Sequence, residues 1–65
     1  MHNIKITKVW LSRVRSKPML IFRFADGREK AKWLDCSLED AERILAKLRA
    51  DVTLGLLGFK DMFPE

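Results

Sequence analysis

The sequence predicts an α+β fold, in which a three-stranded antiparallel β-sheet carries one C-terminal α-helix on one face. Three observations support this prediction. Segments rich in β-branched and aromatic residues fill the first half of the chain. The pair Asp26-Gly27 stands between two of them, where it favours a hairpin turn. Apolar residues at helical spacing then follow Ser37.

The first predicted strand covers residues 3–13, which are rich in Ile, Thr, Val and Trp. Its alternation of apolar and polar side chains is imperfect, because Lys8 falls on the apolar side and Val9 and Leu11 fall on the polar side. A β-bulge near Thr7-Lys8 would restore the alternation for one half of the strand. We expect Trp10 in the core, since large aromatic residues of small domains usually fill the interior. The alternative is that the bulge turns Trp10 onto the opposite face.

The second and third predicted strands cover residues 19–25 and 28–35. Asp26-Gly27 between them favours a two-residue type I′ turn, because both residues tolerate positive φ. This turn sets the pairing of the two strands, and it predicts one apolar face for the helix to cover. That core face consists of Leu20, Phe22, Phe24, Ala31 and Trp33.

The other face of the hairpin is predicted to be basic. Arg23 lies directly opposite Lys30 in this register, and a like-charge pair of this kind costs stability. An anionic group such as phosphate would neutralise it. The alternatives are that both side chains extend into water, or that an acid of the C-terminal tail reaches across. Met19 and Ile21 share this face, so it suits a groove-binding surface, a protein interface, or cover by the chain's own tail.

The predicted helix covers residues 38–52. Ser37 with Asp40 three residues later fits an N-cap followed by an acid. The tail, residues 53–65, is apolar, and we expect it to fold back onto the body. The helix stripe and the aromatic part of the tail consist of Leu38, Ala41, Ile44, Leu45, Leu48, Val52, Phe59, Met62 and Phe63.

Length and composition limit the classes of protein. The chain has 65 residues, 48% of them hydrophobic, so we expect one domain with a small margin of stability. One Cys and one His make neither an internal disulfide nor a four-ligand zinc site, so no metal or cofactor is expected. No apolar run is long enough to span a membrane, and no secretory signal is recognised. The lone Cys36 favours a reducing, cytoplasmic setting.

No constellation of side chains in the sequence predicts catalysis. Cys36 is the only candidate nucleophile, and no family signature surrounds it. His2, the only candidate base of that type, lies next to a chain end. A glycine-rich phosphate loop, metal-ligand spacing and a carboxylate pair are all missing from the sequence. We therefore expect a protein that is not an enzyme.

Positive charge is concentrated in the first half of the chain. Residues 1–34 carry a formal charge of +7 and residues 35–65 carry −3. This asymmetry predicts an anionic partner for the first half, with a merely solvated basic surface as the alternative. The candidate nucleic-acid contacts are Lys5, Arg13, Arg15, Lys17, Arg23, Arg28, Lys30 and Lys32.

Two functions follow as expectations. The first is a binding module for DNA or RNA that uses the basic outer face of the sheet. The second is a protein-interaction module, such as a small regulator, inhibitor or accessory subunit of the kind that mobile elements encode. It would dock on an acidic protein, or on a second copy as a homodimer. Its candidate contacts are Met19, Ile21, Leu56, Leu57 and Phe59.

The predicted layout, three strands followed by one helix, is similar to that of two groups of DNA-binding domains. These are the arm-site domains of some tyrosine recombinases and the plant ethylene-response-type domains. The resemblance is one of architecture, without their sequence motifs. It implies that DNA is contacted by the sheet face opposite the helix.

Overall fold

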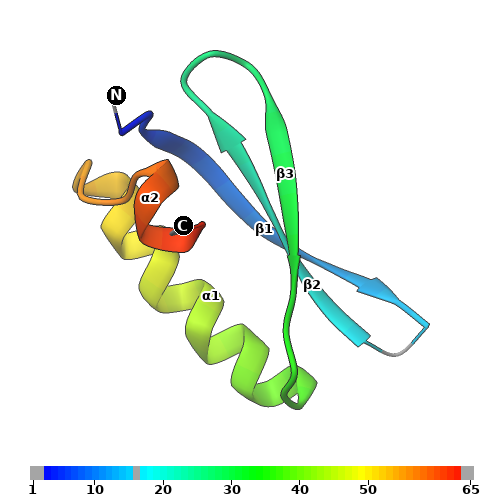
Figure 1. Ribbon diagram of the computed structural model, residues 1–65. Helices are drawn as coiled ribbons and strands as arrows, with labels where there is room; N and C mark the ends of the chain where they lie inside the picture. Colours follow the sequence, from blue (N-terminus) through cyan, green and yellow to red (C-terminus); the bar gives the residue numbers. More distant parts are fainter. Residues whose placement is uncertain (1–2, 16, 64–65) are drawn as a thin grey trace.

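The computed structural model describes residues 3–15 and 17–63 (Figure 1). The three strands form an antiparallel sheet in the order β1-β2-β3, and α1 lies across one face. Among the described residues, no element covers the other face (Figure 1). The predicted α+β class is therefore confirmed. The elements are β1 (Ile6–Val14), β2 (Lys17–Phe24), β3 (Glu29–Trp33), α1 (Leu38–Thr53) and the short α2 (Phe59–Met62).

The bulge that the sequence offered as an alternative near the start of β1 is present. Ile6 faces Phe24 and Lys8 faces Arg23, so Thr7 is the extra residue. The Thr7 hydroxyl donates to the Arg23 carbonyl at 3.2 Å and so provides a partner at the point where the strand ladder is interrupted.

The bulge decides which way the rest of β1 faces. Ile6 and Val9 are both buried, although they are three positions apart. Trp10 follows Val9 and pairs with Ile21, so it lies on the face away from α1. The prediction that Trp10 belongs to the core is wrong, and the alternative of a bulge that turns it outward is the observed arrangement.

The register between β2 and β3 differs from the predicted one by one residue. Arg23 faces Glu29, and Leu20 faces Lys32. The connecting loop holds three residues, 25–27, and the Phe24 N–H donates to the Arg28 carbonyl at 2.9 Å. Gly27, with φ of +91°, occupies the left-handed position that a three-residue hairpin loop requires.

This one-residue shift moves every side chain of β3 to the other face, because side chains alternate with a period of two. Trp33, predicted in the core, is 55% exposed on the uncovered face. Ala31 is on the same face, whereas Lys30 and Lys32 turn toward the helix side. The predicted pair of Arg23 and Lys30 is therefore wrong, since the cross-strand partner of Arg23 is an acid.

The core lies between α1 and the first two strands. Ser37 caps α1 as predicted, because its hydroxyl accepts the Asp40 N–H at 3.2 Å. Gly55 ends the helix with φ of +72°, and it and Leu56 donate backbone N–H groups to carbonyls of the last turn. The buried apolar residues are Ile6, Val9, Leu20, Phe22, Phe24, Ala41, Leu45, Leu48 and Leu57.

The C-terminal segment folds back onto the body, as predicted, and packs beside the core. Backbone hydrogen bonds join it to the start of the chain, with the Ile6 N–H donating to Leu57 and the Phe59 N–H to Ile4. The rings of Phe59 and Phe63 pack against each other and against Phe24, with centroids 5.3 to 6.3 Å apart. This segment therefore covers the part of the sheet that α1 does not reach.

Candidate binding surface on the uncovered face of the sheet

The open face is the side of the sheet away from α1. Its middle is apolar, because Trp10, Ile21 and Ala31 lie side by side across the three strands. Met19 and Trp33 form the next row toward the β1–β2 turn. The open face consists of Lys8, Trp10, Ser12, Lys17, Met19, Ile21, Arg23, Glu29, Ala31 and Trp33.

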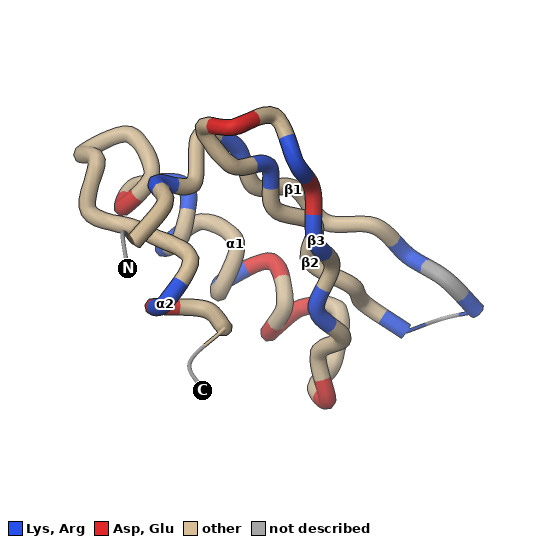
Figure 2. The backbone as a smooth tube through the Cα atoms, turned by 45° about the horizontal axis from the view of Figure 1, so that its top comes forward, with Lys and Arg blue, Asp and Glu red and all other residues tan. Residues whose placement is uncertain are grey.

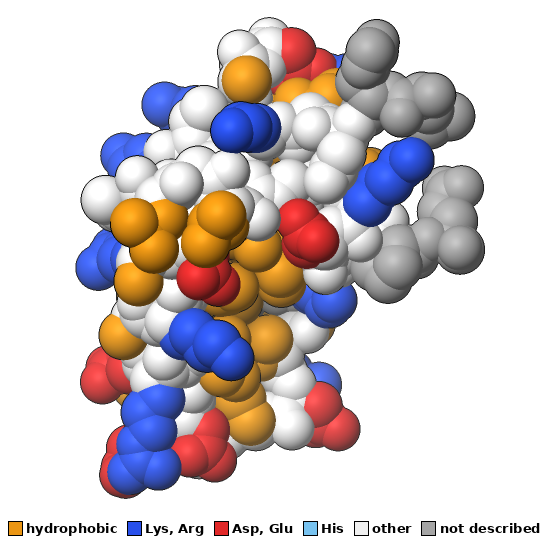
Figure 3. Space-filling view, turned by 90° about the vertical axis from the view of Figure 1, so that its left-hand side faces the viewer, with side chains coloured by type: hydrophobic (Ala, Val, Ile, Leu, Met, Phe, Trp, Pro, Cys, Tyr) orange, Lys and Arg blue, Asp and Glu red, His pale blue; other side chains and the backbone are white. Residues whose placement is uncertain are grey.

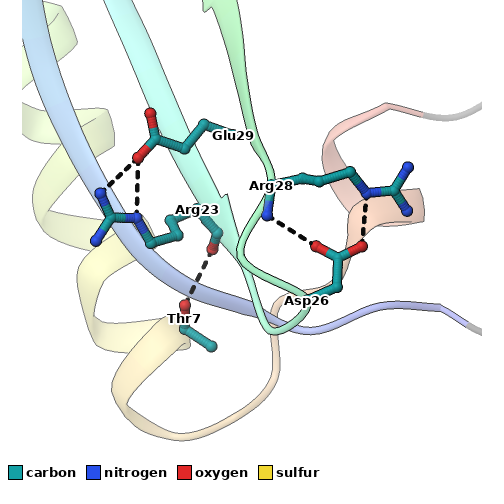
Figure 4. A network of polar contacts seen from close by, with 5 residues as sticks. All are labelled: Thr7, Arg23, Asp26, Arg28 and Glu29. Carbon is teal, nitrogen blue, oxygen red and sulfur yellow. Dashed lines mark hydrogen bonds and ion pairs between the residues drawn. The ribbon is translucent and has the colours of Figure 1, made fainter.

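A charged row of Lys8, Arg23 and Glu29 crosses the open face beside Trp10. Figure 4 shows the Arg23–Glu29 pair of this row. Arg23 donates from Nε and Nη2 to one carboxylate oxygen of Glu29, at 2.9 and 2.5 Å. The Arg23 guanidinium also lies 5.7 Å from the centroid of the Trp10 ring, and the Lys8 ammonium lies 5.3 Å from it. Both members of the Arg23–Glu29 pair are about half exposed, so the pair orients Arg23 more than it stabilises the fold.

The basic tip is the end of the sheet at the β1–β2 turn, with Arg13 near the end of β1, Arg15 in the turn and Lys17 at the start of β2. It lies away from both helices (Figure 2). All three side chains are exposed. In the described part of the chain, none of them has an acidic side chain within ion-pair distance. The tip is therefore a concentration of positive charge that no acidic side chain of residues 3–15 and 17–63 neutralises by an ion pair.

Lys30 and Lys32 belong to the helix side of the sheet and not to the open face. The Lys30 ammonium lies 4.7 Å from the centroid of Phe63 and 5.2 Å from that of Phe59. The Lys32 ammonium donates to the Met62 carbonyl at 2.9 Å. These two cations thus hold the C-terminal segment in place.

The other predicted contacts are also separated from the basic tip. Arg28 directly follows the β2–β3 loop, and it donates from its backbone N–H and from Nε to Asp26 (Figure 4). Lys5 pairs with Gly58 at the other end of the sheet. Of the eight predicted nucleic-acid contacts, the structure places Lys17 and Arg23 on the open face, Arg15 in the turn at its end, and Arg13 at the same end on the helix side, since Arg13 pairs with Pro18.

The pKa of Asp26 is lowered from its ordinary value of 3.8. The main cause is the hydrogen bond from the Arg28 backbone N–H, and the Arg28 side chain adds to it. This carboxylate stabilises its own loop and lies outside the open face.

The predicted protein-interface residues lie in different places, some on the open face and the others in the segment after α1. Met19 and Ile21 are half-buried on the open face, whereas Leu57 belongs to the core. Leu54 and Leu56 remain 68% exposed after the end of α1. Figure 3 views the molecule from the side of α1 and its following loop, where charged side chains of both signs surround the apolar ones.

Sequence reasoning missed the outward position of Trp33 and the roles of Lys8 and Glu29, and it held the outward position of Trp10 only as the alternative. One signal in the sequence indicated the outward position of Trp33. Ala25-Asp26-Gly27 also fits a three-residue hairpin loop with Gly in its last position, and that loop turns Trp33 outward.

Comparisons with models of protein families, with curated proteins and with solved structures find no match to this chain. Within residues 3–15 and 17–63, no group of three or more His, Cys, Asp or Glu side chains is placed to hold a metal ion. No helix in the described part is long and apolar enough to cross a membrane.

Proposed function

We propose that this protein is a non-enzymatic module that binds nucleic acid through the basic tip and the adjoining open face. The observation that carries the proposal is the exposed charge of Arg13, Arg15 and Lys17, which form no ion pair within the described residues, at the end of a sheet face that no described element covers. Lys and Arg clusters of this kind neutralise phosphates, and the release of counterions drives binding. The lone Cys36 suits a cytoplasmic site of action.

The charges of the open face extend the basic tip along the sheet. Lys17 joins the tip to the face, and Lys8 and Arg23 lie farther along it, beside Trp10. Glu29 opposes this attraction, because it is paired with Arg23. We expect phosphate contacts from five cations, three on the open face and two at the basic tip, namely Lys8, Lys17, Arg23, Arg13 and Arg15.

Salt dependence tests this proposal. With about five phosphates engaged, a plot of log K against log salt has a slope of about −4.5 for duplex DNA and about −3.5 for a single strand. We expect labelled DNA or RNA to bind at low salt with a slope of this size. Absence of binding to every nucleic acid at low salt, or an affinity that salt does not change, would overturn the proposal.

A matched pair of variants locates the contacts. The triple variant Arg13→Gln, Arg15→Gln, Lys17→Gln is expected to make the slope shallower by about two to three, because three phosphate contacts are lost. The control Arg43→Gln, Lys47→Gln, Lys60→Gln removes the same charge from exposed positions elsewhere. It should leave the slope unchanged. Equal effects of the two triple variants would show that net charge, and not the basic tip, is responsible.

The Arg23–Glu29 pair supplies a variant that should bind more tightly. Glu29→Gln removes the opposing charge and leaves Arg23 available to phosphate, so we expect affinity to rise by about threefold, the size of an exposed ion-pair interaction. The control Glu39→Gln removes an acid that pairs with Arg43 on α1. Its affinity should match that of the unmodified protein.

We propose protein interaction as the second candidate, favoured by the apolar middle of the open face. Trp33 is 55% exposed there, next to Met19 and near Ile21, and Trp, Met and Arg are enriched in interfaces. Light scattering over a range of concentrations tests whether a homodimer forms. A dimer that Ile21→Asp dissociates would favour this candidate on the open face, and one that Leu56→Asp dissociates would place it at the loop after α1.

A further inference from the structure

Both tryptophans of the chain lie on the open face. The sequence contains two Trp residues and no Tyr. Trp33 is 55% exposed and stands on β3, and Trp10 is half-buried and stands on β1. In the described part of the chain, no cation lies over the Trp33 ring. An indole ring exposed on a flat sheet is a surface on which a nucleic-acid base can stack.

The register sets the distance between the two rings. Trp10 pairs with Ile21 and Trp33 pairs with Met19. The two tryptophans therefore stand on the outer strands, with β2 between them, and are offset by two residues along the strand direction. Strand spacing and residue rise then place their Cα atoms about 12 Å apart. Bases stacked in a duplex are about 3.4 Å apart along each strand. The two rings therefore suit bases of an extended strand, with other nucleotides between them.

The cations around Trp10 complete this surface. Lys8 and Arg23 lie within 6 Å of its ring centroid, at 5.3 and 5.7 Å. A base that stacks on Trp10 displaces one of them, and the displaced charge is then available to the phosphate of the same nucleotide. The strand can continue past Trp33 toward Lys17 and the rest of the basic tip, because Trp33 pairs with Met19 close to that end.

We infer that the open face binds single-stranded nucleic acid, with one base stacked on Trp33 and another on Trp10 across the sheet. This inference rests on the proposed function and names its substrate class. A duplex buries the faces of its bases within its own stack, so it offers nothing to either indole ring. Aromatic side chains on an uncovered sheet are the means by which proteins hold unstacked bases.

Tryptophan fluorescence tests the inference directly, since all of it arises from the open face. We expect an oligothymidine of eight nucleotides to quench the emission, and a duplex at the same phosphate concentration to leave it nearly unchanged. The variants Trp10→Phe and Trp33→Phe each leave one reporter, so they show whether both rings are quenched. Quenching by the duplex equal to that by the single strand would overturn the inference.

Affinity measurements separate stacking from charge. Trp33→Ala should weaken binding to the single strand by about tenfold or more, because one stacking contact is lost. The salt slope should stay the same, since the number of phosphate contacts is unchanged. Trp33→Phe should retain most of the affinity. The control Leu54→Ala, at a position 68% exposed on the far side, should have no effect.

A strand of equal length without bases provides the second control. It offers the same phosphates, so Trp33→Ala and the unmodified protein should bind it equally. If duplex DNA binds as tightly as the single strand and Trp33→Ala changes neither affinity, the inference fails while the proposed function stands. If no nucleic acid binds at low salt, both fail together.

Discussion

The two faces of the sheet are built by the same strands and have opposite properties. On β2, Leu20 and Phe22 are fully buried under α1, whereas their neighbours Met19 and Ile21 are only half-buried on the open face. Alternation of side chains along a strand produces this separation. Core stability and the proposed binding surface can therefore be changed independently by substitutions at adjacent positions.

The helix side is itself covered by two different elements. α1 packs on β1 and β2, while the C-terminal segment covers β3 with Phe59, Met62 and Phe63. The first contact is apolar, and the second combines aromatic rings with the ammonium groups of Lys30 and Lys32. The basic residues of β3 thus belong to the packing of the fold, whereas those of the basic tip have no such partner in the described chain.

The largest effect is expected from a substitution under α1. Phe22→Ala should lower the free energy of unfolding by about 3–5 kcal/mol, because a fully buried ring is replaced by a cavity. A domain of this size has about that much stability in total, so the variant should be largely unfolded at 25 °C. The control Ile21→Ala, on the open face, should cost about 1 kcal/mol. Urea denaturation followed by circular dichroism measures both, and equal costs would contradict the difference between the faces.

The next largest effect on the free energy of unfolding is expected at the turn that leads from α1 to the C-terminal segment. Gly55→Ala should lower the free energy of unfolding by about 1–2 kcal/mol, because a Cβ disfavours its left-handed conformation. Gly55→Asn is the matched control and should cost less, since Asn enters that region more readily. Thermal melts of the three proteins give the order. A cost for Asn as large as that for Ala would show that something other than backbone conformation is responsible.

Substitutions of two lysines that lie over aromatic rings, one on each side of the sheet, compare the helix side with the open face. Lys32→Met should cost about 1 kcal/mol, because the hydrogen bond to the Met62 carbonyl is lost on the packed side. Lys8→Met should cost about 0.5 kcal/mol or less, since Lys8 is exposed over Trp10. Urea midpoints test this order. If Lys8→Met proves the more costly, the charges of the open face are structural and not free for a ligand.

The smallest effect is a pH dependence from Asp26. Because the pKa of Asp26 is lowered in the folded protein, the unfolded chain binds the proton more readily. The Asp26 carboxylate therefore contributes its full stabilisation above its ordinary pKa of 3.8, and this contribution is lost as the pH falls through the pKa of the folded state. Melting temperatures between pH 5 and pH 2 should fall more steeply for the unmodified protein than for Asp26→Asn. Parallel curves would show that the bonds to Arg28 do not stabilise the charged form.

Local signals in the sequence located the elements well. Ser37 caps the helix where expected, the bulge occurs at Thr7, and the aromatic tail folds back. Each depends on residues close in sequence, or on a simple surplus of apolar side chains. The candidate site was predicted less well, because Trp10 and Trp33 were expected in the core and both lie on the open face.

The sequence by itself determined the strands, the helix and the basic character of the β1–β2 turn, because propensity, capping and charge act locally. Only the tertiary structure decided which face of β3 is buried. In Glu29-Lys30-Ala31-Lys32-Trp33 the alternation puts Ala31 and Trp33 on one side and both lysines on the other, yet it is the lysine side that faces the helix. A two-residue and a three-residue loop both suit Asp26-Gly27, so the turn alone does not choose between the two registers. The observed register lets Arg23 pair with Glu29 and lets the rings of the C-terminal segment accept Lys30 and Lys32. Those long-range contacts fix the register that places Trp33 on the open face.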